Sequence, residues 1–154
     1  MPDPTTARSG PNPLPMVGSY RLVQPLGSGG MSSVFRAVHV DTGLEVALKV
    51  LPRTLAKNPV ALQRFLREAR SAEALEHPSV VAIYDRGVDQ GRHYLALEFM
   101  SGGDLHDKVK LDGPLSVERT VEVAKVVADG LRYAAGRGVI HRDVKPANLL
   151  LSAD

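Results

Sequence analysis

The chain has 154 residues, 44% of them hydrophobic and 23% charged, and its formal net charge is +2 at pH 7. This composition is typical of a globular protein with a sizeable core, and the near balance of charge favours no nucleic-acid partner. Because the sequence contains no cysteine, disulfide bonds, thiolate metal sites and a cysteine nucleophile are excluded. No run approaches the roughly 18 apolar residues of a membrane span. We therefore expect a cytoplasmic segment without membrane contact, although an anchor elsewhere in an intact protein stays open.

The first 18 residues are unusually rich in proline, at Pro2, Pro4, Pro11, Pro13 and Pro15. Such a density is incompatible with a helix or a central strand. We therefore expect residues 1–18 to form a disordered or extended leader, and the fold to begin near Ser19.

Strand patterns dominate from Tyr20 to Met100. The candidate strands are "YRLVQPL", "SVFRAVHV", "LEVALKVL", "VVAIYD" and "HYLALEFM". Turn signals at residues 41–43 and 89–91 separate neighbouring strands, which predicts a mostly antiparallel sheet. In residues 44–51 the alternation places Leu44, Val46, Leu48 and Val50 on one face. Lys49 shares the opposite face with Ala47, beside which a flat group could lie.

One helix interrupts these strands. Asn58 suits the N-cap, Pro59 suits the first helical position, and the His77-Pro78 pair ends the helix. At helical spacing, Glu68 lies among the apolar residues Ala61, Phe65, Ala72 and Leu75. A carboxylate on an apolar face needs a partner, so we expect Glu68 to hold a basic side chain. The arginines of this helix, Arg64, Arg67 and Arg70, fit a solvated helix face better than a nucleic-acid site.

Helical patterns dominate after Met100. Residues 101–104 form a short linker, and a long helix is predicted from an N-cap at Ser116 to about Ala135, ended by Gly136. An apolar stripe of roughly 30 Å runs along it and contains Val117, Val121, Ala124, Ala128, Leu131 and Ala135. The sequence after this helix supplies little to cover the stripe.

A glycine-rich segment, "LGSGGMSSV" at residues 26–34, lies between two predicted strands. Glycine permits close approach of backbone N–H groups to an anion. A strand follows rather than a helix, and no Walker-type string occurs, so neither a dinucleotide fingerprint nor a P-loop is indicated. On these residues alone, a phosphate cradle and a plain flexible hairpin remain equally open.

Taken together, four strings resemble the protein kinases, and closely the eukaryotic-like serine/threonine kinases of bacteria. They are "GSGGMSSV", "VALK", "REA" and "HRDVKPAN", in the order of that family, with Ser32 standing where a third glycine is usual. The resemblance covers about Ser19 to the last residue. It implies an α+β kinase-like fold, with a complete small lobe at residues 19–100. A hinge and the incomplete start of a helical large lobe would occupy residues 101–154.

The resemblance implies that ATP and Mg²⁺ are the cofactors. The glycine-rich segment would cover the phosphates, with Leu26, Gly27, Ser28, Gly29, Gly30, Met31, Ser32, Ser33 and Val34. Lys49, held by Glu68, would bind the α and β phosphates. Ala47 and Val34 would line the adenine pocket. Residues of the hinge would complete the nucleotide site: Leu97 as gatekeeper, Glu98 and Met100 through backbone groups, and Asp104 at the ribose.

The same resemblance assigns roles in the segment "HRDVKPAN". Asp143 would accept or orient the proton of a substrate hydroxyl, Lys145 would neutralise the γ-phosphate, and Asn148 would bind magnesium. Lys145, two residues after the aspartate, favours protein serine or threonine as the acceptor. His141 and Arg142 would have structural roles, the arginine awaiting a phosphorylated activation loop.

The sequence departs from the family pattern because no "DFG" follows residue 148. The resemblance implies a strand at residues 148–152, whose hairpin partner would carry the aspartate of that motif. That aspartate and its metal are needed for phosphoryl transfer, so we expect a chain truncated before this motif to be inactive by itself. A non-catalytic nucleotide-binding module, dimerising through its small lobe, is the alternative. A structural domain without nucleotide is disfavoured, since it would have no use for the set Lys49, Glu68, Asp143 and Asn148.

Overall fold

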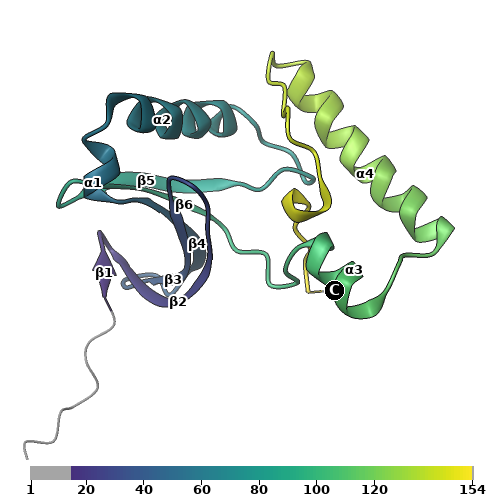
Figure 1. Ribbon diagram of the computed structural model, residues 1–154, viewed down its shortest axis with the longest axis horizontal. Helices are drawn as coiled ribbons and strands as arrows, with labels where there is room; N and C mark the ends of the chain where they lie inside the picture. Colours follow the sequence, from purple (N-terminus) through teal and green to yellow (C-terminus); the bar gives the residue numbers. More distant parts are fainter. Residues whose placement is uncertain (1–14, 154) are drawn as a thin grey trace, which may run out of the picture.

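The computed structural model describes residues 15–153, and within them a curled antiparallel sheet forms the larger body (Figure 1). Its strands, in chain order, are β1 (Met16–Val17), β2 (Tyr20–Ser28), β3 (Ser33–His39), β4 (Glu45–Leu51), β5 (Ile83–Asp89) and β6 (Arg92–Glu98). In space the order is β1-β2-β3-β4-β6-β5. Hairpins at the predicted turns connect β3 to β4 and β5 to β6. The predicted antiparallel sheet is confirmed.

The two faces of β4 pack against different parts of the molecule. Val46, Leu48 and Val50 are buried in a core shared with β2, β3 and β6, as the alternation in the sequence predicts. Leu44 was expected on this face but precedes the strand and is exposed. The opposite face carries Lys49, paired in register with Leu95 of β6. This second face is the one that a helix covers.

Helix α2 (Pro59–Glu73) packs on that second face of the sheet (Figure 1). Its N-cap is Asn58, whose side chain accepts hydrogen bonds from two backbone N–H groups, and Pro59 occupies the first turn, as predicted. Phe65 and Ala69 are buried in a second apolar cluster with residues of β4 and β6. A short helix, α1 (Arg53–Ala56), precedes α2 and was not expected from the sequence.

The part of the chain after the sheet is helical, as expected. It contains α3 (Leu105–Asp112), α4 (Val117–Ala135) and the short 3₁₀ helix η1 (Pro146–Asn148). The side chain of Ser116 caps α4 by accepting from the Arg119 N–H at 3.1 Å, as predicted. Among the described residues, no helix combines the length and apolar character that crossing a membrane requires.

One face of α4 packs inward and another remains open. Gly130 and Ala134 are buried, whereas Val117 and Val121, at the start of the predicted stripe, are 75% and 46% exposed. The inward face is about a quarter-turn or more away from the stripe, given 100° per residue. Apart from Leu131, which is half-buried, the stripe is exposed in the described part of the chain, which agrees with the sequence expectation.

Four boundaries differ from expectation. Helix α2 ends at Glu73, with Ala74 as its C-cap, rather than at the His77-Pro78 pair. Ordered structure begins before Ser19, because β1 pairs with β2 and Val17 is 1% exposed in the core; residues 1–14 of the predicted leader lie outside the described range. Strand β5 begins at Ile83 rather than at residue 80. Residues 148–152 form no strand: Leu150 makes only an isolated bridge with Asp104, because no neighbouring strand is present among the described residues.

Candidate active site

The glycine-rich segment forms the tip of the β2–β3 hairpin. Gly27 pairs with Val34, and the Gly29 N–H donates to the Ser32 carbonyl at 2.9 Å. A Cβ atom built on Gly27, Gly29 or Gly30 would meet no atom within 4 Å, and none of the three has a positive φ. Neither packing nor backbone conformation therefore requires glycine at these positions. The space over the turn is open, which fits the close approach of an anionic ligand.

The predicted lysine–glutamate pair is present. Nζ of Lys49 lies 2.5 Å from Oε1 of Glu68, because α2 packs on the face of β4 that carries the lysine. The Lys49 side chain is 20% exposed and that of Glu68 is 60% exposed, so the carboxylate lies at the rim of the apolar cluster rather than within it. Such an exposed ion pair contributes about 0–1 kcal/mol to stability. Its main effect is to fix the direction of the ammonium group.

Residues 99–104, called the linker from here on, follow β6 and join the two parts of the chain. Leu97 pairs in register with Ala47, and the Glu98 side chain turns away to accept from the Ala82 N–H at 3.2 Å. Met100 is half-buried beyond the strand end. The carboxylate of Asp104, expected at a ribose, caps α3 by accepting from the Asp107 N–H at 2.9 Å. One oxygen of Asp104 is thus committed to the helix.

The linker is bound directly to the segment that follows Asn148. The Gly102 N–H donates to the Leu151 carbonyl at 2.9 Å, and the Leu151 N–H donates to the Gly103 carbonyl at 2.8 Å. A Cβ at Gly102 would lie 2.3 Å from the Ser152 carbonyl oxygen. Glycine is therefore required here by close approach. The sequence analysis did not predict this contact between the linker and residues 151–152. The two consecutive glycines, Gly102 and Gly103, were the signal that could have indicated a close backbone approach.

The segment after α4 gathers the predicted catalytic residues. Nζ of Lys145 lies 2.9 Å from Oδ2 of Asp143. The Asn148 side-chain amide donates to the Asp143 backbone carbonyl at 2.8 Å and to its carboxylate at 3.1 Å. The Asp143 N–H donates to Nδ1 of His141, and Arg142 adopts a left-handed φ of 64°. These contacts hold the Asp143 carboxylate in one orientation at an exposed turn.

The electrostatics of this turn favour an ionised carboxylate. The hydrogen bond from Lys145 is the largest cause that lowers the pKa of Asp143 below its usual range; the Asn148 amide adds to it, while partial desolvation opposes it. Because the Asn148 nitrogen is used by Asp143, its carbonyl oxygen is free to bind a cation. The described residues contain no group of three acidic or histidine side chains suited to a metal. A magnesium ion here would therefore share phosphate oxygens and water as further ligands.

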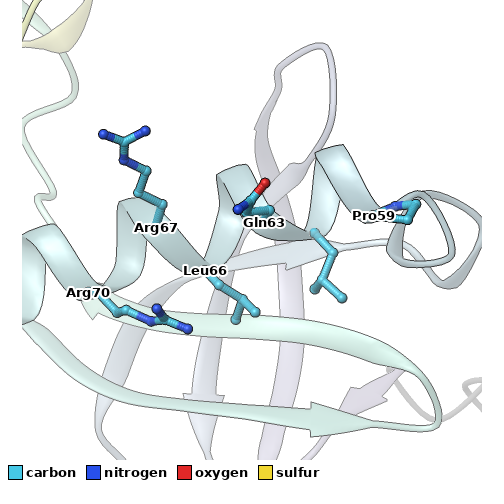
Figure 2. A pocket seen from close by; sticks show the side chains of 6 residues that line it. Pro59, Gln63, Leu66, Arg67 and Arg70 are labelled. Atoms are coloured by element: carbon cyan, nitrogen blue, oxygen red, sulfur yellow. The ribbon is translucent and has the colours of Figure 1, made fainter.

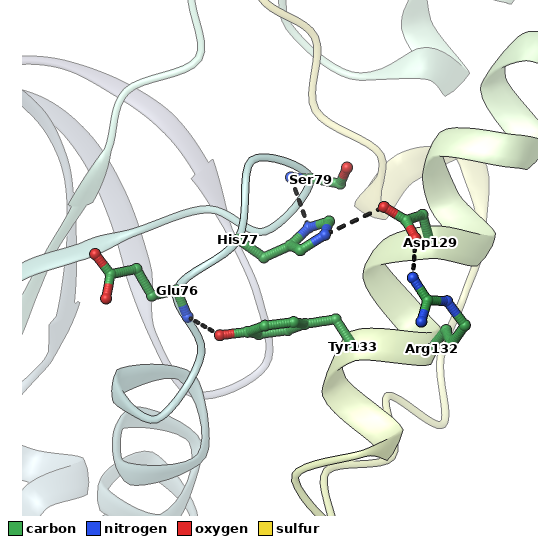
Figure 3. Close-up of polar contacts among 6 residues, drawn as sticks. All are labelled: Glu76, His77, Ser79, Asp129, Arg132 and Tyr133. Carbon is green, nitrogen blue, oxygen red and sulfur yellow. Dashed lines mark hydrogen bonds and ion pairs between the residues drawn. The ribbon is translucent and has the colours of Figure 1, made fainter.

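A polar junction joins the loop after α2 to α4 (Figure 3). The Tyr133 hydroxyl accepts the Glu76 N–H at 3.1 Å, and the Tyr133 ring lies 4.7 Å from that of His77. Nε2 of His77 lies 3.2 Å from Asp129, which also pairs with Arg132 at 2.6 Å. From the sequence, His77 was expected only to end a helix. Its tertiary contacts tie the helix that carries Glu68 to the helix that leads into the catalytic segment.

The predicted residues thus fall into two groups. Lys49, Glu68 and the glycine-rich turn belong to the sheet and α2, whereas Asp143, Lys145 and Asn148 follow α4. In Figure 1 this second segment, drawn in yellow, lies on the side of α4 that faces the sheet. Within the described residues, the linker and the polar junction both connect the two groups.

A separate groove lies along one side of α2 (Figure 2). It is lined by Pro59, Leu62, Gln63, Leu66, Arg67 and Arg70. None of the predicted site residues lines it. The groove is therefore distinct from the candidate active site.

Comparison with known proteins agrees with this geometry. The family model described as "Protein kinase domain" matches residues 20–154. The chain therefore belongs to the protein kinase family, and the expected α+β kinase fold is confirmed.

Among curated proteins, it is similar to the serine/threonine-protein kinase PknB of Mycobacterium leprae, with 41% identity over 138 residues, which cover 87% of this chain and 22% of the relative. It is similarly related to PknB of Mycolicibacterium smegmatis, at 41% identity over 86% of this chain and 22% of the relative. PknJ of Mycobacterium tuberculosis is 43% identical over 86% of this chain and 22% of its own length. The chain thus spans about a fifth of these relatives, and over that part it resembles bacterial serine/threonine kinases.

Proposed function

We propose that this chain is the nucleotide-binding and catalytic-loop part of a serine/threonine protein kinase, which transfers the γ-phosphoryl group of ATP to protein hydroxyls. The observation that carries the proposal is the contact between Lys49 and Glu68. In phosphoryl transfer by this family, a lysine held by a helical glutamate grips the nucleotide phosphates. The pair forms here between residues 19 positions apart in sequence.

The small-lobe residues fit a nucleotide. The open turn at residues 28–32 would cover the phosphates with backbone N–H groups, and Lys49 would bind the α and β phosphates. Ala47 and Val34 would contact the adenine face. The Glu98 carbonyl at the end of β6 and the Met100 amide of the linker would meet the adenine edge. Leu97 would form the back of this pocket, and the remaining oxygen of Asp104 would lie near the ribose.

The catalytic segment would act on the acceptor. Asp143 would accept the proton of a serine or threonine hydroxyl. As it does so, the hydroxyl oxygen would form a bond to the γ-phosphorus of ATP, and the bond between that phosphorus and the ADP oxygen would break. Lys145 would neutralise charge on the transferring group. Asn148 would bind one magnesium ion through its carbonyl oxygen. Magnesium supplies electrostatic stabilisation of the charge that develops on the phosphate oxygens.

Two further statements belong to the proposal. The 154 residues contain no Asp-Phe-Gly string, so this chain by itself would bind nucleotide without appreciable turnover. Because a kinase acts where ATP is available, the proposal includes a cytoplasmic site of action for this segment. Among the described residues, no observation favours a dimer of the small lobe over a monomer, and we do not propose one.

Thermal unfolding of the 154-residue chain with increasing MgATP tests the proposal. We expect a saturable rise in Tm, since a ligand present at 100 times its Kd stabilises a protein by about 2.7 kcal/mol. Lys49→Ala should abolish the rise. Lys108→Ala is the matched control, because Lys108 forms its ion pair with Asp112 on α3, away from the proposed nucleotide site. This variant should keep the full rise. A wild-type chain whose Tm does not respond to MgATP would refute the proposed function.

A further inference from the structure

Arg36 has no role in the function proposed above, yet it lies on the nucleotide-facing side of the sheet. On β3 it is paired in register with Ala47 of β4. Its neighbour Ala37 points into the core and is fully buried. Because side chains alternate along a strand, Arg36 shares a face with Val34, Ala47 and Lys49.

The Arg36 guanidinium connects this strand to the linker. Its Nη2 lies 2.5 Å from Oε1 of Glu45. Its Cζ lies 5.4 Å from the centre of the Phe99 ring, within the range of a cation–π interaction. Phe99 stands between Glu98 and Met100, the two residues whose backbone would meet the adenine edge. Arg36 therefore joins the glycine-rich hairpin to the segment that would recognise the base.

The guanidinium is not held there by complete hydrogen bonding. The Nε–H of Arg36 is buried and has no acceptor among the described residues, which is unfavourable for a donor. The ion pair with Glu45 and the contact with the Phe99 ring must therefore offset this cost. Together, these two contacts fix where the guanidinium lies.

We infer that Arg36 is a positioning residue for the adenine base, acting through Phe99. An adenine between the sheet and the linker needs its ring against Ala47 while its edge meets backbone groups of the linker. The contact between Arg36 and Phe99 fixes the linker relative to β3 and β4. An adenine could then contact Ala47 and the linker backbone at the same time. This inference rests on the proposed function. It assigns Arg36 to recognition of the base and not of the phosphates.

The test compares two ligands that differ in the base. Dissociation constants for MgATP and for magnesium tripolyphosphate, which has phosphates but no base, are measured by calorimetry on the 154-residue chain. Arg36→Met should weaken MgATP binding about three- to tenfold, the range expected for one cation–π contact, and leave tripolyphosphate binding unchanged. Phe99→Leu should have the same selective effect. The double variant should be no weaker than the more affected single variant, because the two residues act as one contact.

Arg53→Met is the matched control. Like Arg36, Arg53 uses its guanidinium to contact a residue distant in sequence, since its Nε donates to the Gln90 carbonyl at 2.8 Å. This contact lies at the β5–β6 turn. The Arg53→Met variant should bind MgATP and magnesium tripolyphosphate with the same dissociation constants as the wild type. If Arg36→Met lowers the Tm of the ligand-free chain far more than Arg53→Met does, Glu45→Gln is used in place of Arg36→Met. Glu45→Gln leaves Arg36 in place and removes its ion pair. The same selective loss is expected.

Four results would overturn the inference. Equal weakening of both ligands would mean that Arg36 acts through its charge on the phosphates. Additive effects of Arg36→Met and Phe99→Leu would mean that Phe99 does not transmit the effect. Unchanged MgATP binding in Arg36→Met would remove the role while leaving the proposed function intact, whereas a wild-type chain that binds neither ligand would overturn both.

Discussion

Replacing Gly102 by alanine tests how tightly the linker is held against the catalytic segment. The added Cβ would lie 2.3 Å from the Ser152 carbonyl oxygen and 2.6 Å from that of Leu151, whereas ordinary contacts of this kind exceed about 3 Å. Both neighbours are backbone atoms, so the two segments must separate. The backbone hydrogen bonds of 2.9 and 2.8 Å between Gly102–Gly103 and Leu151 would then weaken or break. At about 1 kcal/mol for each bond, the free energy of unfolding should fall by about 2 kcal/mol.

Urea unfolding of the 154-residue chain, followed by circular dichroism, measures this loss, and hydrogen exchange should show faster exchange at the Leu151 amide. Gly136→Ala is the matched control. Gly136 ends α4 with φ of −63°, and a Cβ there would meet its closest atoms at 3.6 Å, an ordinary contact. The control should be as stable as the wild type or slightly more stable. If Gly102→Ala unfolds at the same urea concentration as Gly136→Ala, the close approach of the two segments is wrong.

Two other predictions concern the polar junction and the catalytic turn. Tyr133→Phe removes the acceptor of the Glu76 N–H but keeps the ring against His77, so the free energy of unfolding should fall by about 1 kcal/mol; an unchanged urea midpoint would show that this bond does not hold the junction. Lys145→Ala removes the main cause of the lowered pKa of Asp143, so NMR titration of the Asp143 carboxyl carbon should show its pKa rising toward the usual range. Because the pKa of Asp143 is lowered in the folded state, its contacts stabilise the fold above the ordinary carboxyl pKa, and this contribution is lost as pH falls through the lowered value. A titration curve that Lys145→Ala leaves in place would contradict the assignment.

Local patterns in the sequence were sufficient for much of the molecule. The alternation along β4 identified its buried face, and the cap residues Asn58 and Ser116 identified where α2 and α4 begin. Helical spacing singled out Glu68 before any contact was known, and the contact with Lys49 is present. These features depend on residues close in sequence, whose spacing and hydrogen-bonding capacity define strands, helix ends and helix faces.

Contacts between distant residues were decided only by the tertiary structure. Val17 belongs to the core because β1 pairs with β2, although the surrounding prolines indicated a leader. Leu150 fails to form a strand because Asp104 is its only bridge partner among the described residues. The contact of Tyr133 with Glu76 and that of Arg36 with Phe99 join segments more than 50 residues apart. No local pattern encodes such partners, because they depend on how the sheet and the helices pack once each has formed.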